Sequence, residues 1–517
     1  MVPISPSHPC HNCRRRRLRC DKAWPRCQKC ISLREDCLGY DKQFKFINSN
    51  DDQSRRLRGA QRAKTGPSES ALKVAPPPHA PLLPPTDPMF QRLGAPDRRY
   101  LAYFIDRVCP DMVSEDSPTN PFRELIPQVL TKGNECLFHI LLATSALHWS
   151  NSQLPKMLVP SPACVEGSTR PQLIIGQEVK PRSPAVVDAL RSRQEAIRCM
   201  RKVLGGLESD GTDNAVVLGS AMFFVNFDLI DVEKSDLKGG WKAHLEGASK
   251  ILEALCPDKN LGAASSSLRD AIVSELFIYQ ILATTLTATA LTPRVDGYIL
   301  QLWPLLDRCE TNLYLCCPQE ILWIILYASH LASCIAAEGM TEVYFNCALQ
   351  LLDKALAFDI PGWTARLKKG VGTKSDLVSK QHVASAHRSA ACTYILNLIP
   401  AIRPFSQVPL ESLVAESIGH LSSVKKSDPD FKGTPWPTFM TGLNVKDLDT
   451  RSWLLQRLVT VFEKCPWGYI LTAVQVLQDS WMKVDGAAAS LEFGQLEDEN
   501  TGALQQLRAM NFDCLVV

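Results

Sequence analysis

Six cysteines lie close together near the start of this 517-residue chain, and their spacing repeats. Three cysteines follow the pattern C-x2-C-x6-C, and after six residues three more follow it again; they are Cys10, Cys13, Cys20, Cys27, Cys30 and Cys37. Two thiolates at C-x2-C spacing can bind one tetrahedral zinc ion. Two such ions have about eight ligand positions, so six thiolates fill them only if two thiolates bridge. The repeat predicts a two-zinc cluster in which each half supplies three ligands and shares one.

A disulfide knot is the main alternative, because small secreted domains are often built on such knots. The N-terminal residues MVPISPSHPC have no charged start and no apolar core, so we do not expect a secretory signal here. The other 13 of the 19 cysteines are scattered through apolar stretches, as reduced core thiols usually are. A thiol-based redox or metal sensor is a third interpretation, but it leaves the adjacent arginines without a role. These features favour zinc binding in a reducing compartment.

Positive charge is concentrated beside the cysteines. Residues 1–64 contain 16 Lys and Arg against 6 Asp and Glu, a net charge of +10. The whole chain contains 57 against 54, so residues 65–517 carry 41 against 48, a net charge of −7. Five arginines stand between the second and third cysteines, where bound metal would fix their direction. A basic module beside a weakly acidic body indicates nucleic-acid binding; a solvated charge run or a nuclear localisation signal is the alternative.

The complete spacing resembles that of a known protein family. The pattern C-x2-C-x6-C-x6-C-x2-C-x6-C, the basic run after the second cysteine and Pro25 resemble the zinc binuclear cluster of fungal transcription factors. The segments CRRRRLRCD and CQKC...CLGY are similar to sequences of the branch of this family that contains the acriflavine sensitivity control protein. The resemblance implies a nuclear protein that binds two Zn²⁺ ions and double-stranded DNA.

The resemblance also implies roles for individual residues of the cluster. Cys10 and Cys27 occupy the positions of the bridging pair, and Pro25 occupies the position of the proline that shapes the loop between the halves. The remaining four ligands would complete one zinc site with Cys13 and Cys20 and the other with Cys30 and Cys37. A short helix should follow Cys13 and present its N-terminal end to the major groove.

Basic residues of the first half are the implied DNA contacts, and they are Arg14, Arg15, Arg16, Arg17, Arg19 and Lys22. Arg16 and Arg17 occupy base-reading positions, whereas Arg19 and Lys22 resemble backbone contacts. Arginine can donate two hydrogen bonds to guanine O6 and N7, whereas contacts to phosphate give affinity with little sequence choice. Many family members have lysine at the base-reading position, so the unbroken run of arginines is a departure. A CGG-like triplet is still expected.

The residues after the cluster predict a linker. Residues 38–66 do not contain three consecutive heptads with apolar a and d positions, so a homodimer is an open alternative to a monomer. Residues 67–96 contain nine prolines, which favours extended chain without a core. A candidate nuclear localisation stretch, with solvated coil as the alternative, comprises Arg55, Arg56, Arg58, Arg62 and Lys64. We expect a cluster domain at 1–45, a basic and then proline-rich disordered linker at 46–96, and a helical domain at 97–517.

The sequence of the body, residues 97–517, predicts a mostly helical structure. Apolar residues recur at helical spacing in residues 97–109, 189–207 and 240–255, and few stretches alternate as strands do. The stripes that we predict are Leu101, Phe104, Ile105 and Val108, then Leu190, Ile197, Met200 and Leu204, then Trp241, Leu245, Ala248, Leu252 and Leu255. The phrases LFHILLATSALHWSN and GGWKAHLEGASKIL resemble the regulatory domain of fungal transcription factors. That resemblance implies an all-helical region that restrains or directs activation.

Membrane and enzyme functions are less well supported. Residues 321–337, ILWIILYASHLASCIAA, lack charge, but they are at the short end for a membrane span and favour a buried central helix. The body has no G-x-S-x-G or G-x-G-x-x-G motif, and its isolated histidines, such as His148, are typical of satisfied core residues. We therefore expect a mainly α, non-enzymatic nuclear transcription factor of the RNA polymerase II type. Its expected partners are DNA and transcription machinery or co-regulators, with a second copy as the open alternative stated above, and its genes serve metabolism, secondary metabolism or drug response.

Overall fold

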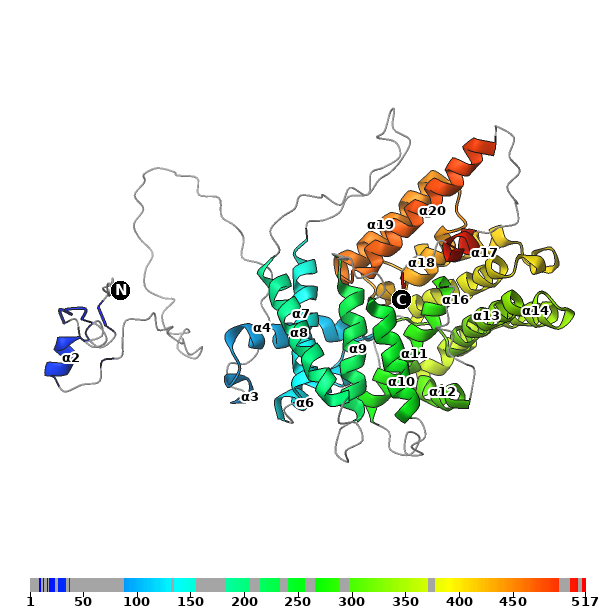
Figure 1. The fold of residues 1–517 in the computed structure, drawn as a ribbon. Coiled ribbons are helices and arrows are strands. Elements are labelled where there is room, and N and C mark those ends of the chain that lie inside the picture. Colours follow the sequence, from blue (N-terminus) through cyan, green and yellow to red (C-terminus); the bar gives the residue numbers. More distant parts are fainter. Residues whose placement is uncertain are drawn as a thin grey trace, which may run out of the picture. The chain divides into compact units, whose positions relative to one another are not determined.

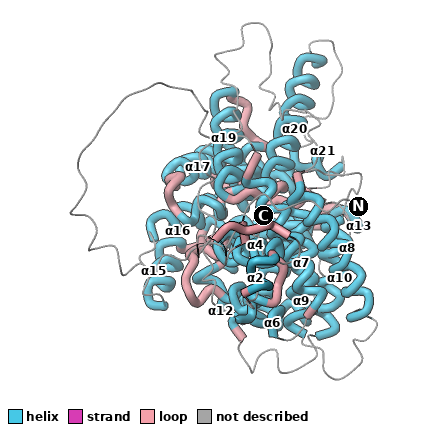
Figure 2. The backbone as a smooth tube through the Cα atoms, turned by 90° about the vertical axis from the view of Figure 1, so that its left-hand side faces the viewer, coloured by secondary structure: helices cyan, strands magenta, loops and turns pink. Residues whose placement is uncertain are grey.

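The computed structural model describes residues 9–10, 13, 16, 18–23, 27–33, 37, 88–131, 134–154, 183–204, 214–232, 240–255, 266–287, 297–370, 377–491, 503–509 and 514–517. Two compact units divide the chain, Met1–Pro78 and His79–Val517. Within these ranges the protein consists of helices and loops, with one isolated bridge between Val113 and Leu313 and no β-strand (Figures 1 and 2). The predicted mainly α fold is confirmed.

Helices account for most of the second unit. Its first half contains α3 Pro88–Gln91, α4 Ala95–Tyr103, η1 Phe104–Val108, α5 Cys109–Asp111, η2 Pro121–Glu124, α6 Leu125–Thr131, α7 Glu135–Ser152, α8 Pro184–Leu204, α9 Asn214–Ile230, α10 Gly240–Leu255 and α11 Ser267–Leu286. Its second half contains α12 Gly297–Cys309, η5 Glu310–Asn312, α13 Gln319–Glu338, α14 Glu342–Leu356, α15 Ile360–Gly370, α16 Leu377–Leu398, η6 Pro400–Phe405, α17 Leu410–Ser423, η7 Pro429–Gly433, α18 Pro435–Gly442, α19 Leu448–Lys464, α20 Tyr469–Leu491 and α21 Ala503–Ala509.

Successive helix pairs build the body around α11. Helix α8 packs on α7, α7 on α9, α9 on α11, α11 on α13, α13 on α16, and α16 on α17 (Figure 1). The side chain of Ser266 caps α11 by accepting a hydrogen bond from the amide of Arg269, and the helix is buried on all sides. A helix that is buried on nearly all sides belongs in the middle of a core. The segment 514–517 is also buried, and Figure 2 shows it among the helices.

The three predicted apolar stripes have different outcomes. In α10 the predicted stripe is buried from Trp241 to Leu252, and the side chain of Leu255 lies outside the described residues. In the segment from α4 to α5, Leu101, Phe104 and Val108 are buried as well, although residues Phe104–Val108 form a π-helix. Proline at 110 explains the wider turn, because it cannot donate to the carbonyl four residues earlier and its ring crowds that carbonyl.

The stripe predicted for α8 is partly wrong. Leu190 and Leu204 are exposed, and the residues that α8 buries are instead Ala189, Ala196 and Cys199. Helix α7 lies so close that the thiol of Cys136 donates to the backbone oxygen of Ala196, at an Sγ–O distance of 3.5 Å. Close approach of two helices selects small residues at the contact, so residue size outweighed hydrophobicity here.

The apolar helix α13 contains residues 321–337, the uncharged segment that is at the short end for a membrane span. By length and composition alone this helix could cross a membrane, but it packs against α11, α14 and α16. Its first three turns are buried, and Ser329 within it accepts or donates hydrogen bonds with Thr284 and Tyr394. Beyond Leu331 the helix is half-buried or exposed, so the prediction of a central buried helix holds for its N-terminal part only.

Candidate metal centre and nucleic-acid interface

The two cysteine repeats adopt the same local structure. The amide of Cys13 donates to Cys10 Sγ at 3.5 Å, and in the second repeat the amide of Cys30 donates to Cys27 Sγ at 3.3 Å. Cys27 is thereby the N-cap of helix α2, Gln28–Ser32. Amide donors directed at sulfur stabilise the thiolate form that a metal ion requires.

A carboxylate joins the first repeat to the second. Both oxygens of Asp21 accept from the backbone amide of Gln28, at 3.0 and 3.1 Å. This contact places a negative charge at the first turn of α2, where the helix leaves amides unpaired. The residue after the third cysteine and the first residue of α2 are therefore joined directly.

The six sulfurs form two overlapping groups. Within each group the four Sγ atoms all lie within 4.8 Å of one another. One group contains Cys10, Cys13, Cys20 and Cys27, and the other contains Cys10, Cys27, Cys30 and Cys37. Cys10 and Cys27 belong to both groups, and their Sγ atoms are 3.5 Å apart. Two four-sulfur groups that share one pair provide eight ligand positions from six side chains.

The chemistry of this donor set fits zinc. All six side chains are free cysteines, four of them are buried, and Cys20 and Cys37 are partly buried against them. Without a cation, burial and the hydrogen bond that the Cys30 thiol donates to Cys27 raise the pKa of Cys30 to about 12. A soft divalent cation removes this penalty because thiolates bind it directly, and four thiolates around one centre are typical of Zn²⁺.

The structure places some of the predicted DNA contacts and leaves others outside the described residues. Arg16 and Arg19 are exposed, and Lys22 is partly exposed. The amide of Leu18 donates to the carbonyl of Cys13 at 2.9 Å, so the chain turns after the second cysteine. Outside the described residues lie Arg14, Arg15, Arg17, Pro25, most of the expected helix after Cys13, and the stretch Arg55, Arg56, Arg58, Arg62 and Lys64.

Lys22 has an unusual backbone conformation. Its φ angle is +59°, in the left-handed region that side chains other than glycine, asparagine and aspartate rarely adopt. Position 22 therefore combines a positively charged side chain with a positive φ angle, and a substitution can change one without the other.

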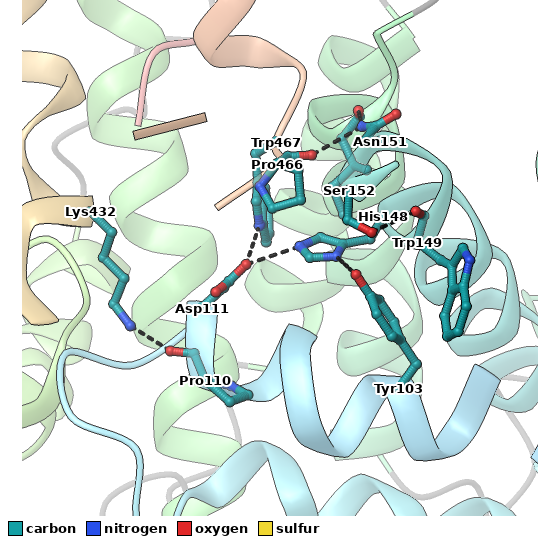
Figure 3. Close-up of polar contacts among 11 residues, drawn as sticks. Tyr103, Pro110, Asp111, His148, Trp149, Asn151, Ser152, Lys432, Pro466 and Trp467 are labelled. Carbon is teal, nitrogen blue, oxygen red and sulfur yellow. Dashed lines mark hydrogen bonds and ion pairs between the residues drawn. The ribbon is translucent and has the colours of Figure 1, made fainter. Parts of the chain in front are cut away.

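A buried polar network in the helical body was not predicted from the sequence. Tyr103 donates to His148 Nδ1 at 2.9 Å, and His148 Nε2 lies 2.9 Å from Asp111 Oδ2 (Figure 3). Trp467 Nε1 also donates to Asp111 Oδ2, at 3.4 Å, and Asn151 Nδ2 donates to the carbonyl of Pro466 at 3.0 Å. Figure 3 shows these side chains converging from α4, α5, α7 and the loop before α20.

Both ring nitrogens of His148, the Tyr103 hydroxyl and Trp467 Nε1 have protein partners, which indicates a structural role. His148 is fully buried and hydrogen-bonded through both ring nitrogens, so the prediction that it is a satisfied core histidine is confirmed. Burial raises the pKa of Tyr103 to about 12, so its hydroxyl remains a donor at neutral pH. The network joins segments more than 350 residues apart, and no short motif signals such a contact.

Comparison with known proteins gave a family match for each of the two parts of the chain. The fungal Zn(2)-Cys(6) binuclear cluster domain matches residues 8–46, and the fungal specific transcription factor domain matches residues 99–492. The chain is 30% identical to the acriflavine sensitivity control protein acr-2 of Neurospora crassa, with 100% of this chain and 99% of that protein covered. No solved structure matches the chain. The two family resemblances seen in the sequence, including the branch, are confirmed.

Proposed function

This chain belongs to the family of fungal transcription factors whose Zn(2)-Cys(6) binuclear cluster domain binds two zinc ions and DNA, and we propose a residue assignment for both. Cys10 and Cys27 bridge the two ions. Cys13 and Cys20 complete one site, and the other is completed by Cys30 and Cys37. The observation that supports this assignment is that Cys10 and Cys27 alone belong to both four-sulfur groups among the described residues. Zinc supplies a rigid scaffold here, because so small a module has little core of its own.

The arginines of the first repeat read the DNA sequence. Arg16 and Arg17 contact base edges of a CGG-like triplet, with Arg14 and Arg15 beside them, whereas Arg19 and Lys22 contact phosphates. The exposure of Arg16 and Arg19 supports contact of both with DNA. A bidentate arginine on guanine discriminates against the wrong base by about 1–3 kcal/mol, whereas a contact to phosphate attracts all sequences alike.

Substitution of one residue of each kind tests the division. Arg17→Ala in the zinc-loaded full chain should weaken binding to a CGG site by about 1–3 kcal/mol and relax the preference at one base position. Lys22→Ala should weaken specific and random DNA equally and lower the salt slope by about one. Lys426→Ala, an exposed lysine of the body, is the control. If Arg17→Ala and Lys22→Ala reduce affinity for specific and random DNA to the same extent, the assignment is wrong.

The helical body controls the output of the cluster rather than binding DNA. We propose the boundaries 1–45, 46–96 and 97–517, with Pro25 shaping the loop of the cluster. The net charge of −7 on residues 65–517 supports this, because such a body does not attract phosphate. A protease site inserted between residues 67 and 87 allows the loaded protein to be cut. Affinity for DNA should stay within several-fold after cutting; a large loss would mean that the body supplies dimerisation or DNA contacts.

The regulated genes serve drug response. The support is the relative from Neurospora crassa, an acriflavine sensitivity control protein that aligns with the whole of this chain. Metabolic or secondary-metabolite genes are the alternative. The protein acts in the nucleus on promoters of RNA polymerase II and recruits co-regulators, with the stretch of basic residues at 55–64 as its localisation signal. Mapping bound promoters in cells with and without acriflavine tests this: drug-response promoters should carry CGG-like sites, and their absence would contradict the proposal.

A further inference from the structure

Two histidines meet between α16 and α17, which pack against each other. Nδ1 of His382 on α16 lies 3.0 Å from Nδ1 of His420 on α17, and the ring centroids are 5.3 Å apart. Both side chains are partly exposed, so solvent and ions can reach them. At this distance one nitrogen carries a proton and the other accepts it, because a neutral imidazole has one N–H donor and one lone pair. Two nitrogens that can each bind a cation therefore converge from two helices.

The separation of these two nitrogens is close to the separation found in a metal site. Two nitrogens that bind one tetrahedral zinc ion at about 2.0–2.1 Å lie about 3.3 Å from each other. The observed pair would have to open by only about 0.3 Å to reach that value. Imidazole is a ligand that suits Zn²⁺, Ni²⁺ and Cu²⁺. A small rotation of the rings therefore suffices to admit such an ion in place of the shared proton.

A carboxylate lies behind one of the two rings. Glu416 Oε1 is 3.7 Å from His420 Nε2, one helical turn earlier on α17, and the same oxygen accepts from Arg388 Nη2 at 2.5 Å. His420 and the Arg388 guanidinium lower the pKa of Glu416 to about 2, so its carboxylate is ionised at neutral pH. A carboxylate beside Nε2 favours the tautomer with its proton on that atom, which leaves the lone pair of His420 on Nδ1. Histidines that bind metal are commonly oriented in this way.

We propose that His382 and His420 bind a divalent transition metal ion through their Nδ1 atoms, with Glu416 orienting His420. Within the described part of the chain no third Cys, His, Asp or Glu ligand atom joins this pair closely, so water fills the remaining positions. Since His420 keeps its proton on Nε2, the shared proton belongs to His382. It moves to His382 Nε2 when the ion binds, and both rings stay neutral. The site lies in the helical body, so it holds or fails independently of the DNA contacts assigned above.

A titration with nickel tests the site. Isothermal titration calorimetry of NiCl₂ into the untagged, zinc-loaded full chain should show a further binding site, and native mass spectrometry checks that both cluster zinc ions remain. His382→Asn and His420→Asn should each weaken this site at least tenfold, because each removes one of two protein ligands. His330→Asn is the matched control, since His330 Nε2 lies 3.7 Å from Cys334 Sγ on α13 and offers the rival pair. No binding at millimolar Ni²⁺, or loss of the site in the control instead, would overturn the proposal.

Nitrogen chemical shifts of the histidine rings identify the atoms that bind. In chain labelled with ¹⁵N-histidine, Zn²⁺ added beyond the two cluster ions should shift the Nδ1 signals of His382 and His420. Glu416→Gln should weaken Ni²⁺ about tenfold and lower the fraction of His420 that holds its proton on Nε2, which a merely structural role would not change. Thermal melting without added metal checks that each variant is folded. If no variant folds, the unmodified chain still decides the question, because unchanged Nδ1 shifts would refute the site.

Discussion

Replacement of Glu275 by glutamine should stabilise the protein at neutral pH. Glu275 is 2% exposed. The hydroxyl oxygen of Tyr279 lies 2.7 Å from Glu275 Oε1 and 2.9 Å from Asn226 Oδ1. A tyrosine hydroxyl has one proton, so it cannot donate to both oxygens at once. A protonated Glu275 resolves the conflict, because it donates to Tyr279 while Tyr279 donates to Asn226. Burial raises the pKa of Glu275 from 4.5 to about 8, which agrees with this protonated form.

The magnitude follows from the two pKa values. Between pH 4.5 and 8 the unfolded chain releases this proton and the folded chain keeps it, so the free energy of unfolding falls as pH rises. At pH 7 the loss is about 3 kcal/mol, from 2.5 pH units at about 1.4 kcal/mol each. Glutamine keeps a donor for Tyr279 and has no proton to lose. Glu275→Gln should therefore gain about 3 kcal/mol at pH 7 and almost nothing at pH 4.5.

Urea unfolding followed by far-ultraviolet circular dichroism measures this difference. The full chain and the Glu275→Gln variant are compared at pH 5, 7 and 8, with Glu253→Gln, an exposed residue of α10, as the control. The gap between the midpoints of Glu275→Gln and the parent should widen as pH rises, whereas the control should follow the parent. A gap that is independent of pH, or a variant less stable than the parent at pH 7, would refute a protonated Glu275.

Three other outcomes can be measured. Native mass spectrometry of the full chain should find two zinc ions. Cys10→Ser should lose both and Cys20→Ser one, because Cys10 belongs to both sulfur groups and Cys20 to one; equal losses would contradict the bridging assignment. Burial lowers the pKa of His387 to about 4, so the free energy of unfolding should fall by up to about 3 kcal/mol as pH falls from 6.5 to 4. The His387→Gln variant should lack this fall, so its urea midpoint should change less over that pH range. An unchanged slope would contradict the lowered pKa. Gly468→Ala should destabilise the body by about 1–3 kcal/mol in thermal melts, because the new Cβ would lie 2.5 Å from the carbonyl oxygen of Asp231. The control Gly247→Ala has free space around its new Cβ and should be neutral or stabilising. Similar melting temperatures for the two variants would argue against the clash.

The metal cluster was the part most readily predicted from the sequence, because its ligands are local. Two C-x2-C-x6-C halves fix which sulfurs can meet, and the structure brings all six together. Helix α10 was also predictable, since a single apolar stripe such as Trp241 to Leu252 leaves one way to bury it. In α8 the buried face depends on how closely α7 approaches, and that distance is a property of the packed pair rather than of either sequence.

The polar network around His148 could not be predicted from hydrophobic periodicity, for a different reason. Its members come from segments that share no local pattern, and the contact between Asp111 and Trp467 spans 356 residues. A lone histidine in an apolar helix predicts that some partner exists, because an unpaired buried polar group is costly. It does not say which residue supplies the partner. The sequence therefore predicted that His148 is satisfied, and only the fold could show that Asp111 and Tyr103 satisfy it.

Among the described residues, the same physical chemistry separates the cysteines of the cluster from the buried cysteines of the body. In the body, thiols such as those of Cys109, Cys316 and Cys465 are buried, and burial raises their pKa well above the ordinary value. Such thiols stay protonated and pack as small apolar groups, so they neither ligate metal nor react readily. The six sulfurs of the cluster are also mostly buried, but they face one another at distances that one cation can bridge. Spacing in the sequence, rather than burial, therefore distinguishes a ligand from a core residue, which is why the adjacent pair Cys316 and Cys317 forms no such group within the described chain.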